Sequence, residues 1–389
     1  MILEIEDKDL EEIINIRHDI HAHPEISGKE IRTTELIKDF AKSLDHIEEV
    51  SIPIASGAVF RLKSDKGGKT IAIRSDIDAI SQQEDLDIPY KSKCPGIMHA
   101  CGHDLHISIL MACMNILSKN RDRLRGDVVF VFQNSEETTK GAKELIDKGL
   151  FDKVNIDYFL GYHNWPLVDA GKVIVKKGAL MAAKTNFIIE VIGRGGHGSD
   201  PHLNIDPIVC AGHIITGLQT VISRNTDPKA PILLSINSIR GGSEDNLLVD
   251  TCKMTATIRS LDKKNFAIAR QRAKELIRNI AKAFSCEVKI TYTDDIDLVY
   301  NSEDMYELAR GFAEEIVGRD KLVDIEATMA SEDFSLYMQR VPSFMYWFGS
   351  SGDGFSKNPL HTKKFYASDK AIKSSAQVLV NAVLGLQGK

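Results

Sequence analysis

Short apolar strands alternate with helical patterns in the first half of the chain, and this alternation restricts the fold more than any other feature. Residues 70–76, 127–133 and 158–163 each form an apolar run that ends in polar residues. Between them, apolar residues recur at helical spacing over 105–117 and 142–150. Such alternation is typical of an α/β fold with a largely parallel sheet between helices. Because sites in these sheets form beyond the carboxyl ends of the strands, we expect the chemistry at the polar strand ends.

The pattern changes after Gly178, where six elements follow one another as strand, helix, strand, strand, helix and strand. They cover residues 184–192, 206–223, 231–239, 252–259, 264–284 and 287–293. This order is typical of a ferredoxin-like α+β unit. The pattern therefore predicts a second, inserted domain.

The remaining chain supplies elements that complete the first sheet. These are a helix at 305–317, a strand at 344–348 and a terminal helix from 368. A length of 389 residues also favours two domains over one. We therefore expect a first domain in two segments, 1–181 and 296–389, with residues 182–295 inserted between them.

Composition excludes several classes of partner. Hydrophobic residues make up 43% of the chain and charged residues 27%, which is ordinary for a globular protein. The net charge is -6 and no run of Lys and Arg supplies a nucleic-acid surface. No stretch approaches eighteen apolar residues, and residues 1–8 are acidic, unlike a secretory signal, so we expect a cytoplasmic protein without a membrane partner. In that compartment the six cysteines are expected as thiols or ligands, not disulfides.

Cys101 and His103 lie in the run His-Ala-Cys-Gly-His-Asp at residues 99–104. Thiolate and imidazole are common ligands of zinc-like ions. No further pair follows at zinc-finger spacing, so the other ligands of a metal site must come from distant segments, as in catalytic sites. The alternative is a buried cysteine beside two histidines at the start of a helix.

Two adjacent carboxylates, Glu136 and Glu137, follow the strand at 127–133. A cation could hold one as a ligand while the other works as a base, although acids are also favoured at a helix N-terminus. His163 ends another strand and His361 lies near the C-terminus; a single histidine at such a place is more often structural. Together, five donors suit two closely spaced divalent ions: Cys101, His103, Glu137, His163 and His361.

Several short segments carry a family resemblance over nearly the whole chain. They are 17–25, 74–79, 98–106, Glu136–Glu137, 195–198, Asn246, Arg259, 329–334 and His361. Through them the chain resembles the amidohydrolase branch of the M20 metallopeptidase family, which includes aminoacylases, carboxypeptidases, hippurate hydrolases and IAA-amino acid hydrolases. The resemblance implies a zinc-exopeptidase-like domain with an inserted lid or dimerisation domain. It also implies two divalent ions, Zn, Mn, Co or Ni, with Cys101 shared between them.

The resemblance also implies roles for residues outside the ligand set. Glu136 would be the general base, and His197, in the glycine-rich segment 193–199, would reach the active site of a partner subunit in a homodimer and stabilise the oxyanion. Asn246 and Arg259 are candidates for binding the substrate carboxylate. The alternatives are a surface loop for His197 and a strand-end salt bridge for Arg259.

Ligated imidazoles need an acceptor on their second nitrogen, so Asp76, Asp78 and Asp104 are expected to support the site from behind the ligands. Two segments depart from the family pattern, residues 80–84 and 134–135, and neither contains a proposed ligand. These departures put in question the shape of the pocket that would hold the acyl group of the substrate.

The expected function is metal-dependent hydrolysis of the amide bond in an N-acyl amino acid or short peptide. Three alternatives remain open at this point. The chain could be a dipeptidase or carboxypeptidase of the same family, a thiol amidase in which His99 or His103 activates Cys101, or a metal-dependent binding protein without activity.

Overall fold

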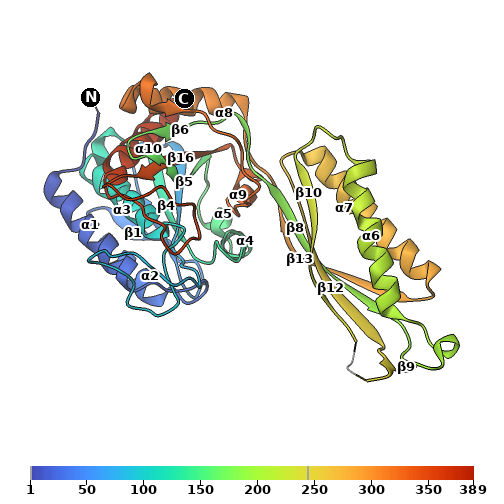
Figure 1. Ribbon diagram of the computed structural model, residues 1–389. Coiled ribbons are helices and arrows are strands. Elements are labelled where there is room, and N and C mark those ends of the chain that lie inside the picture. Colours follow the sequence, from blue (N-terminus) through green and yellow to red (C-terminus); the bar gives the residue numbers. More distant parts are fainter. Residues whose placement is uncertain (1, 243–244) are drawn as a thin grey trace. The chain divides into compact units, whose positions relative to one another are not determined.

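A computed structural model describes residues 2–242 and 245–389 (Figure 1). The chain forms two compact units. The first contains residues 2–178, Tyr300–Glu326 and Asp333–Lys389, and the second contains Ala179–Val299 and Ala327–Glu332. The short segment Ala327–Glu332 therefore packs with the second unit, although the sequence pattern placed it in the first domain.

The first unit is built on an eight-stranded mixed sheet with the order β1-β2-β4-β3-β5-β16-β6-β15. Its strands are β1 (Ile47–Glu49), β2 (Ala58–Leu62), β3 (Gly68–Asp76), β4 (Gly126–Gln133), β5 (Tyr158–Asp169), β6 (Val173–Ile174), β15 (Leu322–Val323) and β16 (Ser343–Ser351). The central pairs β4/β3, β3/β5 and β5/β16 are parallel. The carboxyl ends of β3, β4 and β5 consequently meet at one edge of the sheet.

Helices cover both faces of this sheet. They are α1 (Asp7–Ala22), α2 (Ile31–Lys42), α3 (His103–Lys119), α4 (Gly141–Asp147), α5 (Leu150–Lys153), α8 (Glu303–Val317), α9 (Ser335–Met338) and α10 (Ala371–Gln387). Successive strand residues point to opposite faces. Accordingly, Tyr162 of β5 donates a hydrogen bond to the His106 carbonyl of α3, whereas a Cβ at Gly161 would contact Phe334 beside α9.

Helix α3 is the central helix of the first unit. It is largely apolar and buried on all sides over nearly its whole length, because α1, α10 and β3 pack around it. A helix without a polar face is expected only inside a core. Its N-terminus therefore brings His103 into the interior, next to the carboxyl ends of the strands.

The second unit has one antiparallel sheet with the order β10-β12-β8-β13, covered by α6 and α7. Its main elements are β8 (Ala183–Ile192), α6 (Pro207–Asn225), β10 (Ile232–Arg240), β12 (Thr251–Ser260), α7 (Lys263–Ala283) and β13 (Glu287–Ile296). Both helices begin at an aspartate, Asp206 or Asp262, whose side chain accepts hydrogen bonds from the first backbone N–H groups. The element order is the one that the sequence pattern indicated.

Four short strands complete the description. β9 (Gly196–His197) pairs with β11 (Leu247–Leu248) in the second unit, and β7 (Gly178–Met181) and β14 (Val299–Asn301) lie where the chain passes between the units. Within the described residues, no helix is both long and apolar enough to cross a membrane.

Candidate metal centre

The turn before α3 presents Cys101 and His103 on either side of Gly102. Gly102 is the N-cap residue and has a φ of 85°, in the left-handed region that favours glycine. A Cβ at this position would lie 2.4 Å from Nδ2 of Asn164. The glycine therefore permits both the turn and the close approach of β5.

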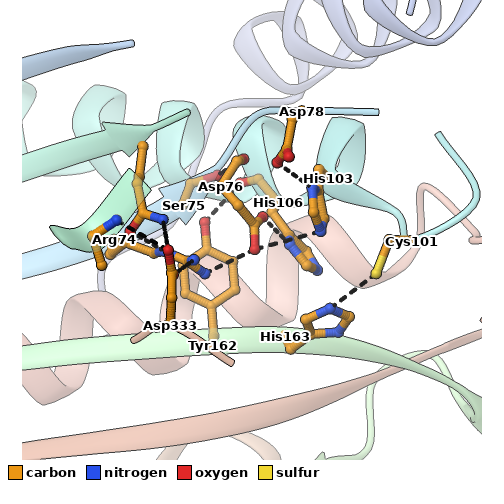
Figure 2. A network of polar contacts seen from close by, with 12 residues as sticks. Arg74, Ser75, Asp76, Asp78, Cys101, His103, His106, Tyr162, His163 and Asp333 are labelled. Carbon is orange, nitrogen blue, oxygen red and sulfur yellow. Dashed lines mark hydrogen bonds and ion pairs between the residues drawn. The ribbon is translucent and has the colours of Figure 1, made fainter. Parts of the chain in front are cut away.

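The five predicted donor residues lie together in the first unit, and Figure 2 shows three of them, Cys101, His103 and His163. The Cys101 Sγ lies 3.4 Å from the His163 Nε2. Cys101, His103 and Glu137 each offer a ligand atom within 4.8 Å of the other two. The Glu137 Oε1 is also 3.1 Å from the His361 Nε2. Donors from four distant segments thus converge at the carboxyl edge of the sheet.

Two of these donor atoms are buried and make no hydrogen bond of normal geometry among the described residues, although each lies close to an oppositely charged side chain, Asp76 or His361. They are the His103 Nε2 and the Glu137 Oε1. An unsatisfied buried polar atom is costly, so these atoms fit a ligand between them. The set of a thiol, imidazoles and a carboxylate suits zinc-like divalent ions.

The Cys101 thiol is also consistent with a cation at this place. Burial raises the pKa of the Cys101 thiol well above its usual value, and the charges of Glu137 and Glu136 raise it further. The protein alone therefore keeps this thiol protonated. A bound cation would supply the missing positive charge that a thiolate needs.

Asp78 orients both the His103 imidazole and the loop that carries Glu137. Its Oδ1 accepts a hydrogen bond from the His103 Nδ1 at 3.1 Å, and its Oδ2 accepts one from the Glu137 N–H at 3.0 Å. His163 is oriented similarly, because its Nδ1 donates to the Asn164 carbonyl at 2.7 Å. In both histidines the Nε2 is therefore left with its lone pair toward the site, as metal ligation requires.

Asp76 accepts a hydrogen bond from His106, a histidine for which the sequence pattern indicated no role. The His106 Nδ1 lies 2.5 Å from the Asp76 Oδ1, and its Nε2 accepts the Asn164 N–H at 2.8 Å. Both ring nitrogens are thus occupied, so His106 is not available as a ligand although it lies beside His103 and His163. In the sequence, the only indication of a role for His106 was its place one turn after His103 in the same helix.

Asp104 accepts hydrogen bonds from residues that are not in the ligand set. Its Oδ2 lies 3.0 Å from both the Arg17 Nε and the His21 Nδ1 of α1. Burial lowers the pKa of His21, but Asp104 and Glu84 outweigh burial and raise it to about 9. Asp104 therefore fixes α1 against the N-terminus of α3, and it does not accept from a ligand imidazole as the sequence argument expected.

Glu136 and Glu137 lie in the turn between β4 and α4. Helix α4 begins only at Gly141, so the two carboxylates are not residues of a helix N-terminus, which was the alternative for this pair. Glu136 is buried, and its charge acts on the Cys101 thiol. The arrangement places one carboxylate among the donors and a second one next to it.

Arg259, in the second unit, donates from Nη1 to the Met329 carbonyl at 2.8 Å. Burial lowers the pKa of its guanidinium. Within the described part of the chain, Arg259 forms no ion pair, so the predicted alternative of a strand-end salt bridge is not what the structure has.

Asn246 lies beside His197, far from Arg259. The Gly198 N–H donates to the Asn246 carbonyl at 2.8 Å, and Leu247 pairs with His197. In the pairing of β12 with β8, Arg259 is opposite Lys184 at one end of β12. Cys252, which follows Asn246 in the chain, is opposite Val191 at the other end. Arg259 lies seven residues after Cys252 in β12, which corresponds to about 23 Å at roughly 3.3 Å per residue. Asn246 and Arg259 of a single chain are therefore too far apart to bind the same carboxylate.

His197 is held in one tautomer. The Ser199 N–H donates to the His197 Nδ1 at 3.1 Å, and the Ser199 hydroxyl lies 2.7 Å from the same atom. A backbone N–H can only donate, so Nδ1 is an acceptor and the proton is on Nε2. The exposed side of this imidazole is therefore a hydrogen-bond donor.

Comparisons with known proteins identify a family and several relatives of this chain. A family model described as peptidase family M20/M25/M40 matches residues 72–385. An N-acetylcysteine deacetylase of Bacillus subtilis is 33% identical over 90% of this chain and 91% of its own length. Thermostable carboxypeptidase 2 of Saccharolobus solfataricus is 33% identical over 98% of this chain and 96% of its own. A solved structure of a dinuclear metal-binding M20 peptidase from Bacillus subtilis has a TM-score of 0.83 and 29% identity, and covers 99% of this chain and 100% of that chain. The α/β fold class predicted from the sequence is confirmed.

Proposed function

The chain belongs to peptidase family M20/M25/M40, and from this premise we propose that it hydrolyses the amide bond of N-acyl amino acids, with acetyl or aryl acyl groups. The observation that carries the proposal is the convergence of five donor residues beside the buried carboxylate of Glu136. Two divalent ions held by Cys101, His103, Glu137, His163 and His361 would polarise the scissile carbonyl and make a bound water acidic. We propose zinc, manganese, cobalt or nickel as their identity.

Glu136 is the general base of the proposed reaction. Its carboxylate takes a proton from the attacking water and passes it to the leaving amine nitrogen. The reaction requires no covalent enzyme intermediate. The neighbouring Glu137 remains a ligand, and Asp78 holds the backbone between these two residues through the Glu137 N–H.

Arg259 is our candidate for binding the α-carboxylate of the substrate. Its guanidinium is half-buried and has no ion pair among the described residues, while one of its donors is fixed by the Met329 carbonyl. A desolvated guanidinium gains most from a carboxylate that can accept two parallel hydrogen bonds. Arg259 would therefore select substrates with a free carboxylate.

His197 and Asn246 would act in the site of a second subunit. Both lie at the end of the second unit opposite to Arg259, and the His197 Nε2–H can donate to the oxyanion that forms when water adds to the carbonyl. The same unit carries exposed apolar side chains at Leu203, Ile208, Val209, Ile239 and Leu247. Its strand β10 is an unpaired sheet edge. Exposed apolar groups beside a free edge favour a homodimer through this unit.

Two other activities have different support. A carboxypeptidase or dipeptidase reaction uses the same machinery, and the Saccharolobus relative bears the name of a carboxypeptidase. A thiol amidase has little support, because a thiol nucleophile needs a lowered pKa and burial raises the pKa of the Cys101 thiol.

The six free thiols favour the proposed cytoplasmic location.

The test is turnover of a panel of N-acyl amino acids, dipeptides and longer peptides, with metal content measured on the same sample. We expect hydrolysis of N-acyl amino acids, loss of activity after EDTA and recovery with zinc, manganese or cobalt. Activity that survives metal removal and is stopped by iodoacetamide would establish the thiol amidase instead. A fully metal-loaded protein that turns over no member of the panel would favour the binding protein.

A further inference from the structure

The turn that carries Glu136 and Glu137 has an unfavourable backbone. Residues 134–140 connect β4 to α4, and both Ser135 and Thr139 have positive φ angles, 54° and 56°. This region is sparsely populated by residues other than glycine. Such a turn keeps its shape only where surrounding groups hold it.

The Asp333 carboxylate binds both ends of this turn. Before the turn, the Gln133 Nε2 lies 2.8 Å from each of the two Asp333 oxygens. After the turn, the Ala142 N–H donates to the Asp333 Oδ2 at 3.0 Å. The ends are in close contact, because a Cβ at Gly141 would lie 1.7 Å from the Asn134 carbonyl oxygen. One carboxylate thus closes the loop at its base.

Arg74 connects this closure to the metal centre (Figure 2). Its Nη2 donates to the Asp333 Oδ1 at 2.9 Å, its Nε to the Gln133 Oε1 at 3.0 Å and its Nη1 to the Asp76 Oδ2 at 2.7 Å. The side chains of Arg74, Asp76 and Asp333 are all fully buried. A displaced Asp333 would therefore disturb Asp76 as well as the turn.

We propose that Asp333 is a positioning residue for the Glu136–Glu137 turn. It does not touch substrate; it sets the place of the general base and of a metal ligand by holding the two ends of the segment that carries them. The assigned roles of the two glutamates rest on the proposed function, whereas the closure of the turn does not. The competing explanation is that Asp333 only balances the charge of Arg74 and stabilises the fold.

The experiment compares Asp333→Asn with Asp127→Asn as a matched control. Asp127 lies at the opposite end of the same strand, β4, and also accepts hydrogen bonds from an arginine and a backbone N–H, those of Arg61 and Ser64. Hydrogen–deuterium exchange would be measured for residues 134–141 in the metal-free and the metal-loaded protein. In addition, kcat and KM would be measured at saturating metal.

We expect Asp333→Asn to speed exchange of residues 134–141 and to lower kcat about tenfold to a hundredfold, because small misplacements of reacting groups are costly. KM should stay within about twofold, since Arg259 is untouched. Asp127→Asn should lower thermal stability without either effect. Unchanged exchange and kcat in folded Asp333→Asn would overturn the proposal.

A second variant covers the case in which Asp333→Asn does not fold. Gln133→Leu removes one of the two attachments of the turn and leaves the Arg74–Asp333 ion pair in place. We expect the same two effects, and normal exchange with normal kcat would again overturn the proposal. If the wild type hydrolyses no substrate of the panel but the variants still exchange faster at residues 134–141, the proposed function fails and the closure of the turn stands.

Discussion

At the scale of single residues, the hydrogen bond made by one ring nitrogen of a histidine decides whether the other nitrogen can bind a metal ion. In His103 and His163 the Nδ1 donates to an acceptor, which leaves the Nε2 for a metal ion. In His106 the Nε2 already accepts a backbone N–H, so the same kind of side chain serves only to orient Asp76. Residue type alone therefore does not distinguish a ligand from its support.

The two adjacent glutamates should respond differently to the same substitution. Glu136→Gln removes the proposed base but no ligand, so we expect roughly a 10²–10⁴-fold loss of kcat with metal content nearly unchanged. Glu137→Gln removes a proposed ligand and should lower metal occupancy. Activity assays with metal analysis by mass spectrometry test this division, and equal rates with full metal in both variants would contradict it.

At the scale of elements, the start of α3 depends on its glycine. Gly102→Ala would place a Cβ against Asn164 and force a left-handed φ, so we expect a loss of roughly 1–2 kcal/mol in the free energy of unfolding. Metal affinity should fall too, because Cys101 and His103 flank this residue. Chemical denaturation and metal titration provide the measurements.

Gly311 is the control for this substitution. It lies inside α8, and a Cβ there would meet no atom within 4 Å. Gly311→Ala should therefore be neutral or stabilise by about 0.5–1 kcal/mol. A Gly102→Ala variant as stable as this control would show that the left-handed turn is not needed.

The contact between α1 and α3 should make stability depend on pH. The pKa of His21 is raised to about 9 beside Asp104 and Glu84, compared with about 6.5 in the unfolded chain. A raised pKa means that the protonated form stabilises the fold. This contribution is fully present below about pH 6.5 and is lost as the pH rises through about 9.

His21→Gln isolates this contribution. Urea unfolding of the metal-free protein from pH 6 to 10 should show a stability difference between wild type and variant that shrinks as the pH rises. A difference that stays constant over this range would mean that the charge of His21 contributes nothing.

At the scale of the whole molecule, the proposed dimer makes each site depend on two chains. His197→Ala should lower kcat by about 10²–10³-fold with full metal content, the usual effect of losing an oxyanion donor. Mixing His197→Ala with Glu136→Gln subunits should restore activity, because a mixed dimer has one site with both groups. With random exchange, about one site in four would be complete.

The controls for this mixing experiment are the separate variants and a demonstration of subunit exchange by native mass spectrometry. No recovery in a sample that has exchanged would show that His197 does not act across an interface. Recovery without a dimer in solution is not expected under any version of the proposal.

Local sequence was sufficient for the parts of the site that lie within a few residues of one another. The apolar runs at 70–76 and 127–133 match β3 and β4 closely. A buried strand must be apolar, whereas polar residues are tolerated at its end, so the change in polarity marks where the strand stops. Strand β5 was expected to end at His163 but continues to Asp169. The polar Asn164 resembled a strand end, whereas its side chain is buried and bonded to the Cys101 carbonyl and close to His106.

The sequence by itself determined the element order, the glycine between two donors and the types of candidate ligand, since these depend on neighbouring residues. Only the tertiary structure decided that His361 meets Glu137, that Asp333 closes the turn of Glu136, and that Asn246 lies beside His197, away from Arg259. These relations depend on strand register and on which buried donor reaches which acceptor. Register and packing are set by contacts between distant segments, and no local pattern carries them.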